Sequence, residues 1–436
     1  MELFSSNEVK TVGISLGGRV QGDVTVDYVP EAGGDRTAQG FIDAWENTFK
    51  DETERINSDT ADMMTASRPV LIDIKTAADC VPGLSDRLIL HSGPPAEYCR
   101  LGEGHRRAVA AAAVFEGWAS GPEEAESLLE KGDIRIDSAD HHNASATGCG
   151  AISPSMPVFR VCDRRTGSYI YAPAAVYGDE KVSDGSCSVK AISSLVFAAE
   201  NLVPALSKAL LSNGSVDIFS VAKEGMSAGD DCCLRTEYCS SAFRNLILKH
   251  TVASGENITE EMLDYLGDPR LFLELFTAAV KAMLVPARNR EGCSFITSYC
   301  SNGRVVGIRI AGKSDRWFTA ELGEDAVCGD EIVCELAGAG SACLCTSAAA
   351  ASGTGLGLFE LLRIMYDSYS ASDRYIEALV NPYSGYPGTP LFVDFIKMCR
   401  TSVPLNALYV RKGVNTVRNI GMQLQMEALR SFVTER

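Results

Sequence analysis

Short apolar runs that end near glycine or proline recur along the first part of the chain, and they predict β-strands. The run before His91 is typical, because it leads into a loop that contains Gly93 and two prolines. We predict strands at Thr11–Leu16, Val24–Tyr28, Pro69–Ile74, Leu88–Leu90, Val158–Cys162 and Ser168–Tyr171.

Longer segments with helical composition dominate the middle and the end of the chain. We predict helices at Thr37–Arg55, His105–Trp118, Pro122–Lys131, Ala191–Leu211, Ile218–Met226, Ala242–His250, Leu356–Leu379 and Gln423–Glu435. Two β-rich runs, Ser294–Ser301 and Arg304–Ala311, are separated by Asn302 and Gly303. Because asparagine and glycine tolerate the positive φ of a tight turn, this spacing predicts a β-hairpin.

This order of elements predicts a multi-domain α/β protein. We expect a small α/β unit at residues 1–65 and an α/β domain with candidate site loops at 66–190. A mainly helical domain is expected at 191–290, and a mixed α/β region with the hairpin at 291–436.

Composition narrows the classes of function. The 436 residues include 40 basic and 57 acidic side chains, and the formal charge of −17 argues against nucleic-acid binding. No early secretion signal is evident, and no uninterrupted apolar run approaches the roughly 20 residues of a membrane helix, so we expect a cytoplasmic protein. Fifteen cysteines without a Cys-x-x-Cys pair favour free thiols over disulfides or a metal site. Phosphate-loop motifs are absent, and we expect no cofactor.

The first candidate site follows the strand that ends at Leu90. His91 and Gly93 combine a titratable ring with an exposed turn at the carboxyl end of a strand, where α/β proteins place ligands. Alternatively, His91 satisfies a buried carbonyl while Gly93 and its prolines shape the connection.

The second candidate site is a polar loop in which Asp140, His142 and Asn143 are followed by Gly148 and Gly150. The polar side chains suit acid–base chemistry, and the glycines let the backbone approach a ligand. The alternative is a polar capping loop without a catalytic role.

The third candidate site surrounds the predicted hairpin and contains Asn302, Arg309, Asp315, Arg316 and Trp317. Two guanidinium groups suit capture of a carboxylate or phosphate, and an indole can form the wall of a pocket. The competing interpretation is a surface salt bridge between Asp315 and Arg316.

Acidic residues near a small-residue run form a fourth candidate. Gly329–Glu331 and Glu335 precede Ala337–Gly340, whose small residues suit the start of a helix, but the adjacent acids oppose anion binding there. Helix packing is therefore the competing role for these glycines.

Many short strings, in order along nearly the whole chain, resemble the family of the AllG subunit of bacterial oxamate carbamoyltransferase. They lie at Val26–Tyr28, Pro30, Gly33–Asp35, Leu90–Pro95, Glu116–Ala119, Ser153–Pro157, Gly307–Arg309, Asp315–Ala320, Gly329–Asp330, Glu335, Ala337–Gly338, Gly388–Pro390 and Asp394. The resemblance implies a role in allantoin use, where oxalurate and phosphate give oxamate and carbamoyl phosphate. It also implies a complex of several different subunits and a carbamate kinase that uses the product.

The reaction implied by the resemblance suggests roles for the candidate site residues. We predict His91, His142 and Asp140 as catalytic residues, with a histidine protonating the departing nitrogen. Amides near Gly93 or Gly148 are candidate oxyanion donors. The predicted substrate-binding residues are Gly93, Asn143, Asp230, Asn302, Arg309, Asp315, Arg316, Trp317 and Glu335.

The chain departs from the family pattern in three places. Cys233, Leu234 and Thr236 replace a histidine and asparagines near Asp230, and His141–Thr147 replaces a histidine run followed by Val-Gly-Pro-Met. The tail after Pro404 lacks a family histidine. Two hypotheses remain open: a carbamoyltransferase subunit acting on oxalurate or another ureido acid, and a non-catalytic structural or regulatory subunit. Homo-oligomer formation is also left open.

Overall fold

The computed structural model describes residues 35–434, apart from 254, 256–257, 314–315, 323–325, 373, 412–413 and 420, and four short strands before them. The early strands are β1 (Thr11–Val12), β2 (Ser15–Leu16), β3 (Arg19–Val20) and β4 (Val24–Thr25). β1 pairs with β4 and β2 pairs with β3, both antiparallel. The glycine turn expected at 33–34 lies outside the described residues.

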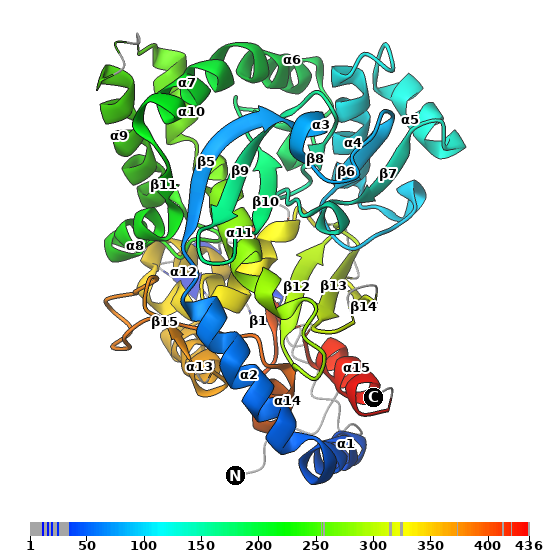
Figure 1. The fold of residues 1–436 in the computed structure, drawn as a ribbon, viewed down its shortest axis with the longest axis vertical. Helices are drawn as coiled ribbons and strands as arrows, with labels where there is room; N and C mark the ends of the chain where they lie inside the picture. The colour runs from blue at the N-terminus through cyan, green and yellow to red at the C-terminus, as the bar shows by residue number, and fades with distance from the viewer. Residues whose placement is uncertain are drawn as a thin grey trace.

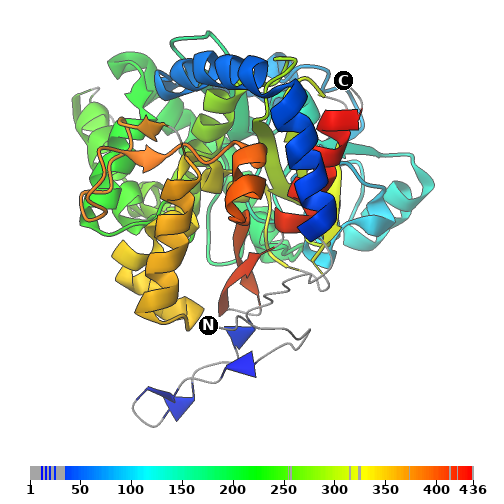
Figure 2. The ribbon, with the colours of Figure 1, turned by 90° about the horizontal axis from the view of Figure 1, so that it is seen from below.

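Two helices follow where one was predicted. α1 (Asp35–Thr48) ends just before α2 (Lys50–Thr65), and Trp45 and Met64 enter the main core. α1 contacts α15 (Gly421–Thr434), so segments from both ends of the chain lie side by side (Figure 2).

The central sheet is antiparallel and has the strand order β10-β9-β5-β11. Its strands are β5 (Pro69–Thr76), β9 (Pro157–Asp163), β10 (Tyr169–Pro173) and β11 (Val216–Asp217). The buried helix α11 (Pro269–Leu284) contacts β5, β9 and β10 and also β12 (Ile296–Ser301) (Figure 1). α11 therefore joins the central sheet to the hairpin region.

A second sheet contains the predicted strand before His91. β6 (Leu88–His91) pairs in parallel with β7 (Arg135–Ser138) and antiparallel with β8 (Ala151–Ile152). The short helix α3 (Ala77–Cys80) precedes β6, and α4 (Glu103–Phe115) and α5 (Pro122–Lys131) connect β6 to β7. The carboxyl ends of the parallel pair point to the same edge of the sheet.

The middle of the chain is helical, as predicted. It contains α6 (Val189–Phe197), a π-helical turn (Ala198–Leu202), α7 (Val203–Asn213), α8 (Ile218–Ala228), α9 (Glu237–Ala253) and α10 (Glu260–Gly267). The continuous helical segment Val189–Leu211 is apolar and long enough to cross a membrane by those two criteria. One such helix is weak evidence, since core helices pass the same test.

The last part of the chain is mixed. β12, β13 (Val305–Ile310) and β14 (Phe318–Glu321) form an antiparallel sheet that contains the predicted hairpin, and Gly303 has a φ of +84°. The remaining elements are α12 (Ala348–Thr354), α13 (Leu358–Ser370), β15 (Tyr375–Ile376), β16 (Thr389–Pro390), α14 (Phe395–Thr401), β17 (Asn406–Arg411), β18 (Val414–Asn419) and α15. The helix predicted to reach Leu379 ends at Ser370. The predicted α/β class is confirmed.

Candidate functional site

Two of the predicted loops meet at the carboxyl ends of β6 and β7. Ser138 is paired with His91 at the last position of the parallel ladder. The Ser138 hydroxyl donates to the Gly93 carbonyl at 2.5 Å and accepts from the Asp140 amide at 3.4 Å. Strand pairing and one capping serine thus place the loop of Gly93 beside the loop of Asp140.

Asp140 is the centre of a buried charge network. Its carboxylate accepts hydrogen bonds from Ser298 at 2.8 Å and from Arg309, and it pairs with Lys281 at 3.2 Å and Arg288 at 3.6 Å. Burial alone raises the pKa of the Asp140 carboxyl, but the three cations offset this and hold the pKa below its usual range. Asp140 therefore stays ionised.

Lys281 links Asp140 to a second buried carboxylate, Asp330. Lys281 Nζ donates to the Ala144 carbonyl at 2.9 Å and to Asp330 at 3.1 Å. Asp330 also accepts the amides of Gly93 at 2.9 Å and Ala146 at 3.0 Å. Burial lowers the pKa of Lys281, but Asp330 and Asp140 raise it by more, so the amine remains charged. The Gly93 amide predicted as an oxyanion donor is already bonded to Asp330.

The two arginines of the network have hydrogen-bond donors that no acceptor satisfies. Arg288 Nη1 donates to the Asn143 side-chain oxygen at 2.7 Å, while its Nε and Nη2 are buried without a hydrogen-bond partner. Arg309 Nε is also buried without a partner, and its guanidinium lies 5.6 Å from the Trp317 ring centre. Because buried donors are rarely left unsatisfied, these groups indicate capacity for an added acceptor.

The charges of the network do not cancel. Three cations face two carboxylates, Asp140 and Asp330, which leaves one net positive charge; Lys281 and Arg309 are buried and Arg288 is largely so. Such a surplus in a low-dielectric interior favours an anion as ligand.

Beside this network lies a more exposed pair of histidines. Asp137 accepts from His141 at 2.9 Å and from His142 at 3.1 Å, and Trp317 donates to His141 at 3.3 Å. The hydrogen bond with Asp137 raises the pKa of His142. This hydrogen bond therefore favours the protonated form of His142, whose Nδ1 also lies 2.6 Å from the Pro82 carbonyl oxygen.

His91 has a different environment. It is fully buried, and its Nδ1 lies 2.8 Å from the carbonyl oxygen of Ser92. Burial lowers the pKa of His91, and it lowers that of the equally buried His105 to about 3. The position of His91 fits the structural alternative, a ring that contacts a buried carbonyl.

The hairpin residues do not all reach the network. Arg316 Nη1 donates to the Ser431 hydroxyl at 3.1 Å, and its guanidinium lies over Phe318, so Arg316 faces α15. Asn302 shapes the hairpin turn by accepting the Val305 amide at 3.0 Å. Asp315 lies outside the described residues.

Asp230 and Glu335 belong to other buried contacts. Asp230 accepts the Cys239 amide at 2.7 Å, and Glu335 accepts the Ser341 amide at 3.0 Å. Burial raises the pKa of Glu335 to about 8 and that of neighbouring Asp231 to about 7. These two acids bind backbone amides in other parts of the fold and do not belong to the network around Asp140.

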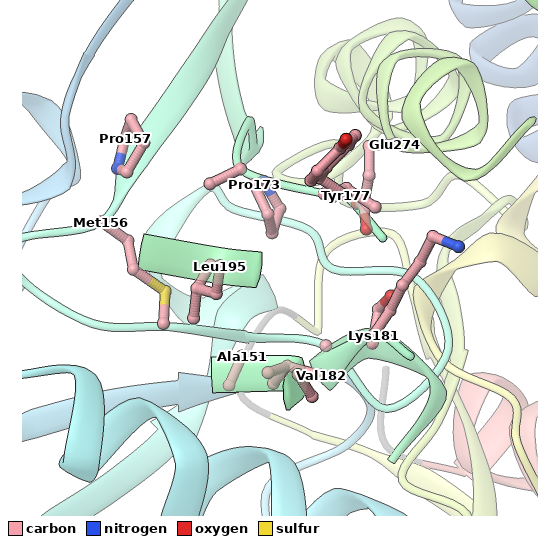
Figure 3. Close-up of a pocket in the computed structure, with 14 residues that line it drawn as sticks. Ala151, Met156, Pro157, Pro173, Tyr177, Lys181, Val182, Leu195 and Glu274 are labelled. Carbon is pink, nitrogen blue, oxygen red and sulfur yellow. The ribbon is translucent and has the colours of Figure 1, made fainter. Parts of the chain in front are cut away.

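A small cavity lies beside Gly150 and Ala151. It offers about 30 Å³ and is lined mainly by apolar side chains, including Met156 and Leu195, with Glu274 and Lys181 opposite (Figure 3). This space suits one or two water molecules rather than a substrate. Glu274 instead holds the loop, because its carboxyl accepts the Thr147 hydroxyl at 2.7 Å.

The described part of the chain contains no set of side chains arranged to bind a metal ion. No group of three or more histidine, cysteine, aspartate or glutamate side chains is arranged there to hold an ion. All fifteen cysteines are free thiols.

Sequence reasoning missed Lys281 and Arg288 as site residues, and it placed Asp330 only in the fourth, acidic candidate, apart from Asp140. Lys281 and Glu274 lie seven residues apart in α11, whose residues Leu271–Leu284 are all buried. Two charged residues on one side of an otherwise apolar segment were the available signal, because such charges need buried partners.

Comparison with known proteins agrees with the resemblance seen in the sequence. The family model described as oxamate carbamoyltransferase subunit AllG matches residues 134–328. That region includes Asp140, Lys281, Arg288 and Arg309. The predicted resemblance to this family is confirmed.

Two curated relatives come from Escherichia coli (strain K12). Oxamate carbamoyltransferase subunit AllG is 27% identical over 61% of this chain and 65% of its own length. The uncharacterized protein YahG is 24% identical over 67% of this chain and 63% of its own length. The match therefore spans just under two thirds of either relative.

A solved structure shares the fold. A conserved protein of unknown function from Enterococcus faecalis V583 superposes with a TM-score of 0.81 and 22% sequence identity. The match covers 88% of this chain and 99% of that one.

Proposed function

We propose that this chain, which is similar to the AllG family over residues 134–328, is a subunit of an oxamate carbamoyltransferase-like enzyme. The proposed reaction is the phosphorolysis of oxalurate, or of a related ureido acid, to oxamate and carbamoyl phosphate. The observation that carries this proposal is the buried network around Asp140, with its surplus positive charge and its unsatisfied arginine donors.

The reaction brings two anions together. A phosphate oxygen forms a bond to the carbamoyl carbon, the bond from that carbon to the amide nitrogen breaks, and the proton of hydrogen phosphate ends on that nitrogen. The cations Lys281, Arg288 and Arg309 offset the repulsion between the reactants. In this proposal His142 relays the proton, since its hydrogen bond with Asp137 raises the pKa of its ring and favours the protonated form.

The proposed setting follows from the same premise. We expect a cytoplasmic protein that acts in allantoin nitrogen use with other subunits of the complex, and with neither nucleic acid nor membrane as partner. A carbamate kinase would consume the carbamoyl phosphate.

A non-catalytic or regulatory subunit is the second candidate, and specific observations favour it. His91 is fully buried, and Asp140 is engaged by Ser298 and the cations, so neither is free to exchange protons with a substrate. In that case the reacting groups lie in another subunit.

Colorimetric detection of carbamoyl phosphate tests the proposal. Oxalurate and phosphate are supplied to the purified chain alone and to the chain with the products of its neighbouring genes. We expect product in the second sample at least. If product forms equally well when this chain is left out, the regulatory candidate is supported. If neither sample forms product although the protein is folded, the proposed reaction is contradicted.

A further inference from the structure

We propose that Arg288, together with Arg309 and Asn143, forms the subsite that holds the carboxylate of the oxamate moiety, in preference to phosphate. The choice of oxamate as ligand rests on the proposed function. Arg288 is the new element, because neither the sequence patterns nor the family resemblance singled it out.

The free edge of Arg288 has the shape of a carboxylate receptor. Nε and Nη2 carry parallel N–H bonds on one side of the guanidinium plane, and both are buried without a hydrogen-bond partner. The nearest acidic atom in the network, Asp140 Oδ1, is 3.6 Å from Nη2, beyond hydrogen-bond distance. A two-oxygen planar anion matches these parallel donors better than a single tetrahedral oxygen does.

Asn143 contacts the same guanidinium group through its third nitrogen, Nη1. It is exposed, has a φ of 52° and accepts Nη1 of Arg288 at 2.7 Å. Because protein atoms cover Nε and Nη2, a carboxylate reaches them only after a local rearrangement, and the exposed Asn143 side chain is the group proposed to move. The Asn143 amide group can then donate to the amide carbonyl next to the carboxylate of oxamate.

Charge favours the same ligand. The network of Lys281, Arg288, Arg309, Asp140 and Asp330 carries one surplus positive charge. A carboxylate monoanion neutralises it, whereas hydrogen phosphate dianion leaves a buried negative charge. Phosphate is therefore expected to bind elsewhere, where it can approach the carbamoyl carbon.

Isothermal titration of the full chain with oxamate, inorganic phosphate and acetamide tests the subsite. Oxamate should bind, and Arg288→Lys, which keeps the charge but removes the parallel donors, should weaken it at least about tenfold. Acetamide, which lacks the carboxylate, should not bind. Arg290→Lys is the matched control, since Arg290 contacts Met63 and not the network.

A second variant guards against misfolding of the first. Asn143→Asp lies at the surface, tolerates the positive φ and should itself occupy Arg288, so oxamate affinity should again fall at least about tenfold. Unchanged oxamate affinity in either folded variant overturns the subsite. It is also overturned if the Arg288 variant loses affinity for phosphate but not for oxamate. If the wild-type protein forms carbamoyl phosphate but does not bind oxamate, the subsite is wrong and the proposed function stands. If oxamate binds but no carbamoyl phosphate forms, the subsite stands and the proposed function is wrong.

Discussion

At the scale of single residues, Asp140 is the group on which the candidate site depends. It faces Lys281, Arg288 and Arg309, so Asp140→Asn leaves three buried cations with one carboxylate, Asp330. We expect a loss of about 3 to 5 kcal/mol in the free energy of unfolding, because an uncompensated buried charge costs that much. Urea denaturation followed by circular dichroism measures it.

The control for Asp140→Asn is Asp133→Asn, at an exposed aspartate on the approach to β7. Its effect should stay within about 0.5 kcal/mol. A similar small effect for both variants would show that the buried cations are satisfied without Asp140.

The sequence placed Asp140 and Asn143 in one candidate cluster and Arg309 in another, and the structure joins the two clusters around Asp140 and Arg288. Arg316 was expected beside Arg309 but faces α15. Spacing along the chain could not reveal the shared partner, since Arg288 follows a helix that the apolar pattern did not delimit.

At the scale of elements, the site depends on direct contact between the loop that contains Gly148 and the loop that contains Gly329. A Cβ atom at Gly329 would lie 2.2 Å from the Gly148 carbonyl oxygen, and Asp330 donates its amide to Ala146 at 3.1 Å. Gly329→Ala must push the loops apart, so we expect a loss of about 3 kcal/mol or more and weaker ligand binding. Thermal unfolding and oxamate titration are the measurements.

Gly121→Ala is the matched control for this loop contact, because no atom lies within 4 Å of a Cβ placed there. It should change stability by less than about 0.5 kcal/mol. A Gly329→Ala variant as stable as this control would mean that the loops separate freely.

Element prediction succeeded where the period of the sequence was clear. β5, β6, α5 and the β12–β13 hairpin match their predicted positions closely. α11 was missed because it is buried on all sides and therefore shows no polar face. Its apolar run could not be distinguished from a buried strand by periodicity alone. The helix predicted to Leu379 ends at Ser370 because the following residues pair as β15 with β16.

At the scale of the whole molecule, the α/β class followed from the order of elements, while the long-range contacts that build the site did not. Asp330 reaches back to Gly93, and Glu274 reaches back to Thr147. These pairings join segments that no local pattern connects, and they bury several acids whose ionisation then affects the stability of the entire fold.

Glu274 allows that dependence on pH to be measured. Burial raises the pKa of its carboxyl from 4.5 to about 8, despite the hydrogen bonds from Thr147. Between these values the folded protein holds a proton that the unfolded chain has lost. The contribution of Glu274 is therefore fully present below about pH 4.5 and is lost as the pH rises through about 8.

Glu274→Gln removes this dependence because glutamine does not ionise. Any fixed cost of replacing the carboxyl cancels when the two proteins are compared at pH 5.5 and at pH 8. We expect the variant to gain about 2 to 3 kcal/mol relative to wild type over that interval, measured by urea denaturation. Glu54→Gln, at an exposed position in α2, should keep a constant offset. A constant offset for Glu274→Gln as well would mean that the buried carboxyl is ionised throughout, with its charge compensated by Arg270, which lies close enough to lower the pKa of Glu274.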